Sequence, residues 1–149
     1  TKTTMEAQSI IISNESELIL FGASFVKNYK GGDIILLKGD LGAGKTTITK
    51  GFAKGLGIKE HVTSPTFKIV SEYNIESGIL FHIDCYRLGS YMEFIELDAE
   101  RFLYSDNGIT LIEWPENIYE IIPKDVIYIN FSLGENENCR NLTVKGISV

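Results

Sequence analysis

The sequence predicts an α/β fold, with a central sheet of mixed parallel and antiparallel strands and helices on both faces. Apolar runs near residues 34, 80 and 110 are separated by segments with helical periodicity, which is typical of parallel strands covered by helices. Turn residues at 76–78 separate two extended segments and indicate an antiparallel hairpin, expected at one end of the sheet. The 149 residues suffice for one core but not for two ordinary domains, so we expect a single domain over 1–149.

The first elements follow from the start of the chain. Residues 1–7 are polar, and we expect them to be frayed or disordered, so that the first strand is Gln8–Ser13. Either the last residue of that strand or Asn14 can cap a helix, and Glu17 completes an arrangement like a capping box. The helix should end at the glycine pair 31–32. Its predicted buried face is Leu18, Phe21, Phe25 and Val26.

The rest of the chain alternates between apolar runs bounded by turn residues and segments whose apolar side chains recur three and four residues apart. The predicted strands are Asp33–Lys38, Phe67–Ile75, Ile79–Asp84, Ile109–Ile112, Asp125–Leu133 and Leu142–Val149. The predicted helices are Thr46–Leu56, Tyr91–Ser105 and a short one that begins at Pro115 and runs toward Ile122.

Composition narrows the class of partner and the compartment. Hydrophobic residues make up 44% and charged residues 23%, which is ordinary for a globular protein. The net charge of −6 disfavours direct binding of RNA, because nucleic-acid contact normally needs a basic patch. Cys85 and Cys139 form neither a disulfide framework nor a zinc motif, and we expect both to be reduced and buried. There is no run of 18 apolar residues and no export signal, so we expect a cytoplasmic location.

Gly39–Thr47 reads G-x-x-x-x-G-K-T followed by a second threonine, which is the pattern of a phosphate-binding P-loop. Its glycines let successive backbone N–H groups point at an anion. Lys45 is expected among the β- and γ-phosphate oxygens, and the Thr46 hydroxyl on a magnesium ion. A predicted strand precedes the loop and a predicted helix follows it, so the sheet is expected to be P-loop NTPase-like. The residues expected to bind the nucleotide in this loop are Leu41, Gly42, Ala43, Gly44, Lys45, Thr46 and Thr47.

A P-loop site also needs an acidic group that helps to hold the magnesium ion. Asp84 and Glu113 each follow an apolar run, and ligands of open α/β sheets bind beyond the carboxyl ends of strands. Both acids could therefore face the same phosphates, although an acid at a strand end is otherwise a turn residue. The loop Thr63–Thr66 offers three hydroxyl groups directly after the P-loop helix and could sense the nucleotide, or be an ordinary capped turn.

Four further side chains leave alternatives open. Trp114 could line a pocket wall or sit in the core. His82 is expected to point away from the Asp84 face or to pack in the sheet, and His61 to lie on the surface, so neither is expected to act as a base. Arg87 could meet a phosphate or a partner's acid, or form a surface salt bridge.

Four motifs in register resemble one family. They are Gly39–Thr47, Ser64–Phe67, His82–Leu88 and Ile112–Pro115, and their order and spacing are similar to those of the bacterial TsaE family, over about residues 9 to 145. That family is the small ATPase required for threonylcarbamoyl modification of the adenosine beside the anticodon of tRNA. Cys85 departs from the family pattern, in which bulkier residues are common at this position, and this difference puts little of the resemblance in doubt.

The resemblance implies ATP in the P-loop and magnesium held by Thr46 and Glu113. It implies that Asp84 matters for hydrolysis, together with Lys45, and that Ser64–Thr66 is a switch loop, in which Thr66 would be catalytic. Glu15 and Arg140 correspond loosely to parts near the adenine. The implied partners are the tRNA threonylcarbamoyl-transfer enzyme and its paralogous partner protein, so that tRNA is reached only indirectly, as the acidic charge also favours.

Other functions remain open from the residues alone. A small-molecule kinase usually needs several arginines around the transferred phosphoryl group, but the three here are far apart in the sequence: Arg87, Arg101 and Arg140. A GTPase is disfavoured because no Asn- or Thr-Lys-x-Asp segment follows the P-loop. A non-hydrolysing nucleotide-dependent binding module would use the same nucleotide-binding residues. For an ATPase we expect slow hydrolysis by the isolated protein, because no strong base or arginine finger stands out.

Overall fold

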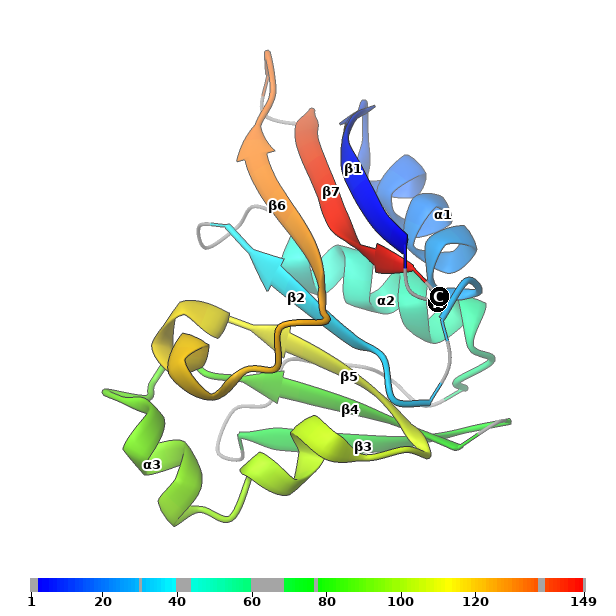
Figure 1. Cartoon of the computed structure of the whole chain (residues 1–149). Helices are drawn as coiled ribbons and strands as arrows, with labels where there is room; N and C mark the ends of the chain where they lie inside the picture. The colour runs from blue at the N-terminus through cyan, green and yellow to red at the C-terminus, as the bar shows by residue number, and fades with distance from the viewer. Residues whose placement is uncertain are drawn as a thin grey trace.

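The computed structural model describes residues 3–29, 31–39, 44–59, 69–76, 78–136 and 139–148 (Figure 1). Its helices are α1 (Glu15–Val26), α2 (Lys45–Gly55) and α3 (Tyr91–Glu96), with two 3-10 helices, η1 (Glu100–Tyr104) and η2 (Pro115–Ile121). Its strands are β1 (Thr3–Ile12), β2 (Ile34–Lys38), β3 (Val70–Ile75), β4 (Gly78–Asp84), β5 (Gly108–Glu113), β6 (Ile127–Leu133) and β7 (Arg140–Ser148).

All of these strands form one sheet in the order β1-β7-β6-β2-β5-β4-β3. The four central strands β6, β2, β5 and β4 run parallel to one another. β3 pairs antiparallel with β4, while β7 pairs antiparallel with both β6 and β1. The mixed α/β sheet predicted from the sequence is therefore confirmed, but antiparallel strands flank the parallel centre at both ends rather than at one.

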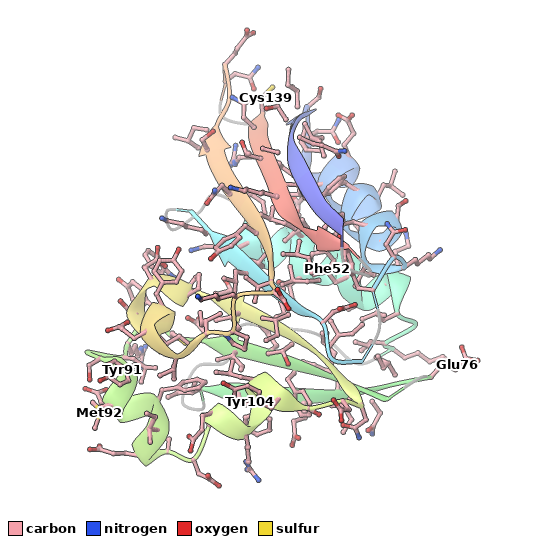
Figure 2. All side chains as sticks on the ribbon, in the orientation of Figure 1. Phe52, Glu76, Tyr91, Met92, Tyr104 and Cys139 are labelled. Carbon is pink, nitrogen blue, oxygen red and sulfur yellow. The ribbon has the colours of Figure 1, made fainter. Side chains whose placement is uncertain are left out.

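The two faces of the sheet have separate cores. In Figure 1, α2 passes behind β2 with α1 next to it, and α3 lies apart from both, at the lower left. The core under α1 and α2 includes Leu18, Phe52, Leu80 and Leu111, and Figure 2 labels Phe52 there. The opposite core, under α3 and the 3-10 helices, includes Ile83, Phe94 and Ile112. Because neighbours in a strand point to opposite faces, the two sets alternate along β4 and β5. Helices on both faces are thus confirmed.

The predicted capping box of the first helix is present. The Asn14 side chain accepts a hydrogen bond from the Glu17 N–H at 2.9 Å, and the Glu17 carboxylate accepts one from the Ser13 N–H at 2.9 Å. These two bonds satisfy backbone donors that an α-helix leaves without partners. Of the predicted face, Leu18 and Val26 are buried, while Phe21 and Phe25 are partly buried against the same core. Among the described residues, no helix is long and apolar enough to cross a membrane.

Two boundaries differ from the sequence prediction. β1 begins at Thr3, so residues 3–7, expected to be frayed, belong to a strand that pairs with β7 as far as Thr3 opposite Ser148. This pairing joins the two ends of the chain, and the polar sequence of the segment does not reveal it. The predicted helix 91–105 is divided into α3 and η1 at Asp98, whose φ of 57° is left-handed. The break allows Ala99 to be buried in the same core as Phe94.

Candidate active site

The candidate site lies where α2 begins and where β4 and β5 end. Gly44 caps α2 with φ of 110°, a conformation that side chains rarely adopt. A Cβ at Gly44 would come within 2.8 Å of the Leu18 side chain in the first half of α1. The requirement for glycine at this position of the P-loop motif therefore has two physical causes, the backbone angle and the close packing of α1.

Lys45, the first residue of α2, has a buried side chain that points back toward β2. Its Nζ donates a hydrogen bond to the Gly39 carbonyl at 2.6 Å and lies 3.9 Å from the centroid of the Trp114 ring. Both contacts are favourable to a cation, because the carbonyl oxygen and the face of the ring are electronegative. Lys45 is thus held at the N-terminal end of α2, where the helix dipole also favours an anion.

Asp84 and Glu113 end neighbouring strands and are direct register partners in the parallel pair of β4 and β5. They share the face of Leu80 and Leu111, which is the face covered by α2. Burial raises the pKa of the Asp84 carboxyl above its ordinary value, and the Glu113 charge raises it further, while the Tyr86 N–H and the charges of His82 and Lys45 oppose this. The direct bond from the Tyr86 N–H to Asp84 Oδ1 measures 3.0 Å.

His82 contacts Glu113 inside the sheet layer. Its Nε2 atom lies 2.6 Å from Glu113 Oε2, and the His82 side chain is fully buried. Of the two alternatives for His82, packing in the sheet is confirmed by its full burial, and pointing away from the Asp84 face is wrong, because residues two apart in a strand share a face. The spacing of His82 and Asp84 carried that signal in the sequence. The partner could not be identified without the register of β4 against β5. We refer to Lys45, His82, Asp84 and Glu113 as the charged cluster.

Trp114 lies beside this cluster and is partly buried against the core under α3, in agreement with its core alternative, while a pocket wall stays a prediction. It has a left-handed φ of 56°, and its ring lies 4.9 Å from the Tyr86 ring, centroid to centroid. The segments that follow β4 and β5 are tied together by bonds from the Cys85 N–H to the Glu113 carbonyl and from the Asn117 side chain to the Cys85 carbonyl, at 3.0 and 2.8 Å. These bonds set the Trp114 ring over Lys45.

The other predicted site residues fall into two groups. Thr46 and Thr47 lie in the first turn of α2 beside Lys45, with Thr46 exposed. Glu15 is exposed at the start of α1, and Arg140 is partly buried at the start of β7. The Cys139 Sγ lies 3.8 Å from the Ser13 carbonyl, which brings the start of β7 near the start of α1. Leu41, Gly42, Ala43, Thr66 and the rest of the Thr63–Thr66 loop, with His61, lie outside the described residues, so those predictions stay predictions.

The donor set fits a magnesium ion bound together with a nucleotide. Magnesium prefers hard oxygen ligands and keeps only one or two carboxylates, the rest being water and phosphate oxygens. Glu113 and the Thr46 hydroxyl are ligands of this kind at the same end of the sheet. Within the described residues, no group of three or more His, Cys, Asp or Glu could hold a metal by itself. The described residues therefore suit a cation that phosphate oxygens help to hold, rather than an independent metal centre.

Comparison of the sequence with known proteins finds one family model and relatives that carry the same family name. The model of the family described as threonylcarbamoyl adenosine biosynthesis protein TsaE matches residues 12–142. A tRNA threonylcarbamoyladenosine biosynthesis protein TsaE of Haemophilus influenzae is 37% identical over 131 residues, which are 85% of this chain and 82% of that protein. The protein of the same name from Bacillus subtilis is 47% identical over 100 residues, which cover 67% of this chain and 61% of the relative's length.

A solved structure extends the similarity to the fold. The crystal structure of YdiB from Bacillus subtilis superposes with a TM-score of 0.78 and 35% sequence identity. The superposition covers 97% of this chain and 87% of the YdiB chain. The overall fold described above is therefore similar to that of an experimentally determined structure.

Proposed function

Because the chain belongs to the TsaE family, which acts in tRNA threonylcarbamoyladenosine biosynthesis, we propose that it is a magnesium-dependent ATPase of that process. It binds ATP, hydrolyses it slowly when alone, and supports the modification by binding the modification enzyme complex. The observation that carries the proposal is the placement of the buried Lys45 beside Asp84 and Glu113, at the start of the helix that follows the P-loop motif.

The phosphates occupy the P-loop. The P-loop motif would bind them through its backbone N–H groups, and Lys45 would exchange the Gly39 carbonyl and the Trp114 ring for phosphate oxygens. Thr46 and Glu113 would hold the magnesium ion, which would neutralise charge on the phosphate oxygens. Glu15 and Arg140, which lie at the starts of α1 and β7, would be the residues nearer the adenine.

Asp84 orients the attacking water and accepts its proton, assisted by Thr66 of the switch loop. Its half-buried position supports this role, because a carboxyl whose pKa is raised is a better base than an ordinary aspartate. Slow turnover is expected because Arg87 and Arg101 are exposed and Arg140 lies on β7, two strands from β2 in the sheet. Arginine is not among the side chains that form the charged cluster, so stabilisation of the transition state is incomplete without a partner.

The partners are the threonylcarbamoyl-transfer enzyme and its paralogous partner protein. With a net charge of −6 the protein is repelled by the tRNA backbone, so it reaches tRNA through those partners. ATP binding changes the state of the complex with these partners, and the protein does not itself modify tRNA.

The test combines binding, turnover and assembly. Nucleotide affinity and steady-state ATP hydrolysis are measured for the wild-type protein with and without the partner proteins, with Lys45→Ala as the inactive control. Pull-down of the partners with and without ATP is followed by measurement of tRNA modification. We expect weak hydrolysis alone, stimulation by the partners and loss of both in the variant. Fast turnover in isolation, or phosphorylation of a metabolite, would contradict the proposal.

A further inference from the structure

The strongest unexplained contact in the charged cluster is the bond between His82 and Glu113. We propose that His82 is a positioning residue, whose Nε2–H fixes the Glu113 carboxylate at the end of β5 for a divalent cation bound with the nucleotide. The inference rests on the proposed function, because the cation is the magnesium ion of that site. It adds a role for a histidine that was not predicted to act as a base.

The geometry of the pair is set by the sheet. His82 lies opposite Leu111 in the parallel pair of β4 and β5, and Glu113 is two residues further along β5 on the same face. On its other side, β4 pairs with β3, where Ser71 lies opposite His82. Because β4 is hydrogen-bonded on both edges, its backbone is held firmly, and the imidazole of His82 starts from a fixed backbone position. β5 is paired on both edges as well, with Leu37 and Asp84 opposite Glu113, but Glu113 is the last residue of this strand.

The unpartnered ring nitrogen identifies the tautomer. Within the described residues His82 Nδ1 is buried and has no hydrogen-bond partner, whereas Nε2 lies 2.6 Å from Glu113 Oε2. Buried N–H groups without an acceptor are rarer in proteins than acceptors without a donor. A proton therefore belongs on Nε2, where it is donated to the carboxylate. His82 acts as a donor to Glu113 and not as a competing ligand.

The bond uses one carboxylate oxygen and restricts the other. Within the described residues the Glu113 side chain accepts this one hydrogen bond, through Oε2, so Oε1 can serve the cation. Without this bond the Glu113 side chain would sample several rotamers, and it would lose that conformational entropy when it binds the cation. The neighbouring Asp84 carboxylate would also repel Glu113, and the His82 donor opposes that displacement. Hydrogen bonds to metal-binding carboxylates have this function in metalloproteins, and their loss typically lowers metal affinity by about 10–100-fold.

The test separates positioning from simple structural support. His82→Leu removes the donor, whereas the amide of His82→Gln reaches about as far as Nε2 and can restore it. His82→Asn places its amide near the position of Nδ1, short of Glu113, and provides a second variant without the bond if His82→Leu does not fold. Thr110→Val is the matched control. It removes a part-buried 2.8 Å hydrogen bond, to the Phe102 carbonyl, from the opposite face of the same β5.

The first measurement is the affinity for a non-hydrolysable ATP analogue in EDTA. The second is the Mg²⁺ concentration at which half of the metal-dependent increase in that affinity is reached. The third is Mn²⁺ binding, followed by electron paramagnetic resonance. We expect His82→Leu and His82→Asn to keep the affinity in EDTA but to need about 10–100-fold more metal. His82→Gln and Thr110→Val should resemble the wild type in metal dependence.

Two results would overturn the positioning role: unchanged metal dependence in both variants that lack the donor, or a defect in His82→Gln as large as in His82→Leu. A wild-type protein that binds no nucleotide, or that binds it without any effect of Mg²⁺, would instead refute the proposed function and the positioning role with it.

Discussion

The ammonium group of Lys45 lies between the carbonyl of Gly39, at 2.6 Å, and the ring of Trp114, whose centroid is 3.9 Å away. Trp114 follows Glu113 directly, so the residue after the proposed magnesium ligand contacts the proposed phosphate-binding lysine. This arrangement couples the end of β5 to the start of α2. Any ligand that attracts Lys45 must therefore change the surroundings of the indole ring.

Tryptophan fluorescence should report nucleotide binding. The chain contains one tryptophan, so its emission arises from Trp114 alone. We expect ATP to produce a saturable change in emission, because Lys45 leaves the ring for the phosphates. Lys45→Ala should abolish the response and lower ATP affinity by about 10–100-fold, since a hydrogen bond to a charged group contributes about 1.5–3 kcal/mol. Lys38→Ala, which removes the contact of Lys38 with Tyr119 at 5.7 Å, is the matched control and should respond normally. Bound nucleotide with unchanged emission would show that Lys45 does not move.

Substitution of Asp84 should separate binding from turnover. Asp84→Asn keeps the size of the side chain and its acceptor for the Tyr86 N–H, but removes the base. We expect ATP affinity near that of the wild type and a loss of turnover of about a hundredfold or more, which is the usual contribution of a general base. Asp84→Ala should behave similarly, and Glu72→Gln, an exposed change on β3, should alter neither quantity. If either Asp84 variant lost nucleotide binding, Asp84 would have a structural or magnesium-holding role.

Local patterns explain which parts of this structure the sequence could predict. The capping box at Asn14 and Glu17 depends on neighbouring residues alone, and it was predicted correctly. The end of β2 and the start of α2 were placed correctly around the P-loop motif for the same reason. The start of β1 at Thr3 was missed because it depends on β7, at the other end of the chain.

The difference between local patterns and contacts of distant segments also explains which parts of the candidate site could be predicted. The acids Asp84 and Glu113 could be found because each ends an apolar run, and the direction of parallel strands brings such ends together. The His82–Glu113 and Lys45–Trp114 contacts join residues 31 and 69 positions apart in the sequence (113 − 82 and 114 − 45). The first needs the exact register of two strands and the second the position of α2 over the sheet. Neither quantity is encoded in a short window of sequence.

The packing of α1 on α2 should be sensitive to volume at Gly51. A Cβ at Gly51 would collide with the Ile19 carbonyl oxygen of α1, next to the buried Phe52. We expect Gly51→Ala to lower the free energy of unfolding by about 1–3 kcal/mol through overpacking, although alanine is otherwise favoured in helices. Lys50→Ala, at the exposed neighbouring position, should change it by less than about 0.5 kcal/mol. Denaturant titration measures both, and equal stability of Gly51→Ala and the wild type would show that the helices separate easily.

The two cysteines should differ in reactivity. Burial, together with the negative charges of Asp84 and Glu116, raises the pKa of the Cys85 thiol well above its usual range. Cys139 is partly exposed between β6 and β7, far from α3 and its Tyr91 and Met92 (Figure 2). A thiol reagent should therefore label Cys139 quickly and Cys85 only on unfolding. Cys139→Ser should remove the fast phase, and rapid labelling of Cys85 in the native protein would contradict its burial.

The raised pKa of Cys85 also determines whether its contribution to the free energy of unfolding rises or falls with pH. An unfolded thiol ionises above about pH 8.5, whereas the folded Cys85 stays protonated, so the unfolded state loses a proton that the native state keeps. Its contribution to stability is thus full below that pH and declines above it, by up to about 1.4 kcal/mol per pH unit. Denaturant titrations of the wild type and Cys85→Ala between pH 7 and 10 measure this. The variant should show a weaker decline in the free energy of unfolding, because alanine has no proton to lose, and parallel curves would contradict the effect.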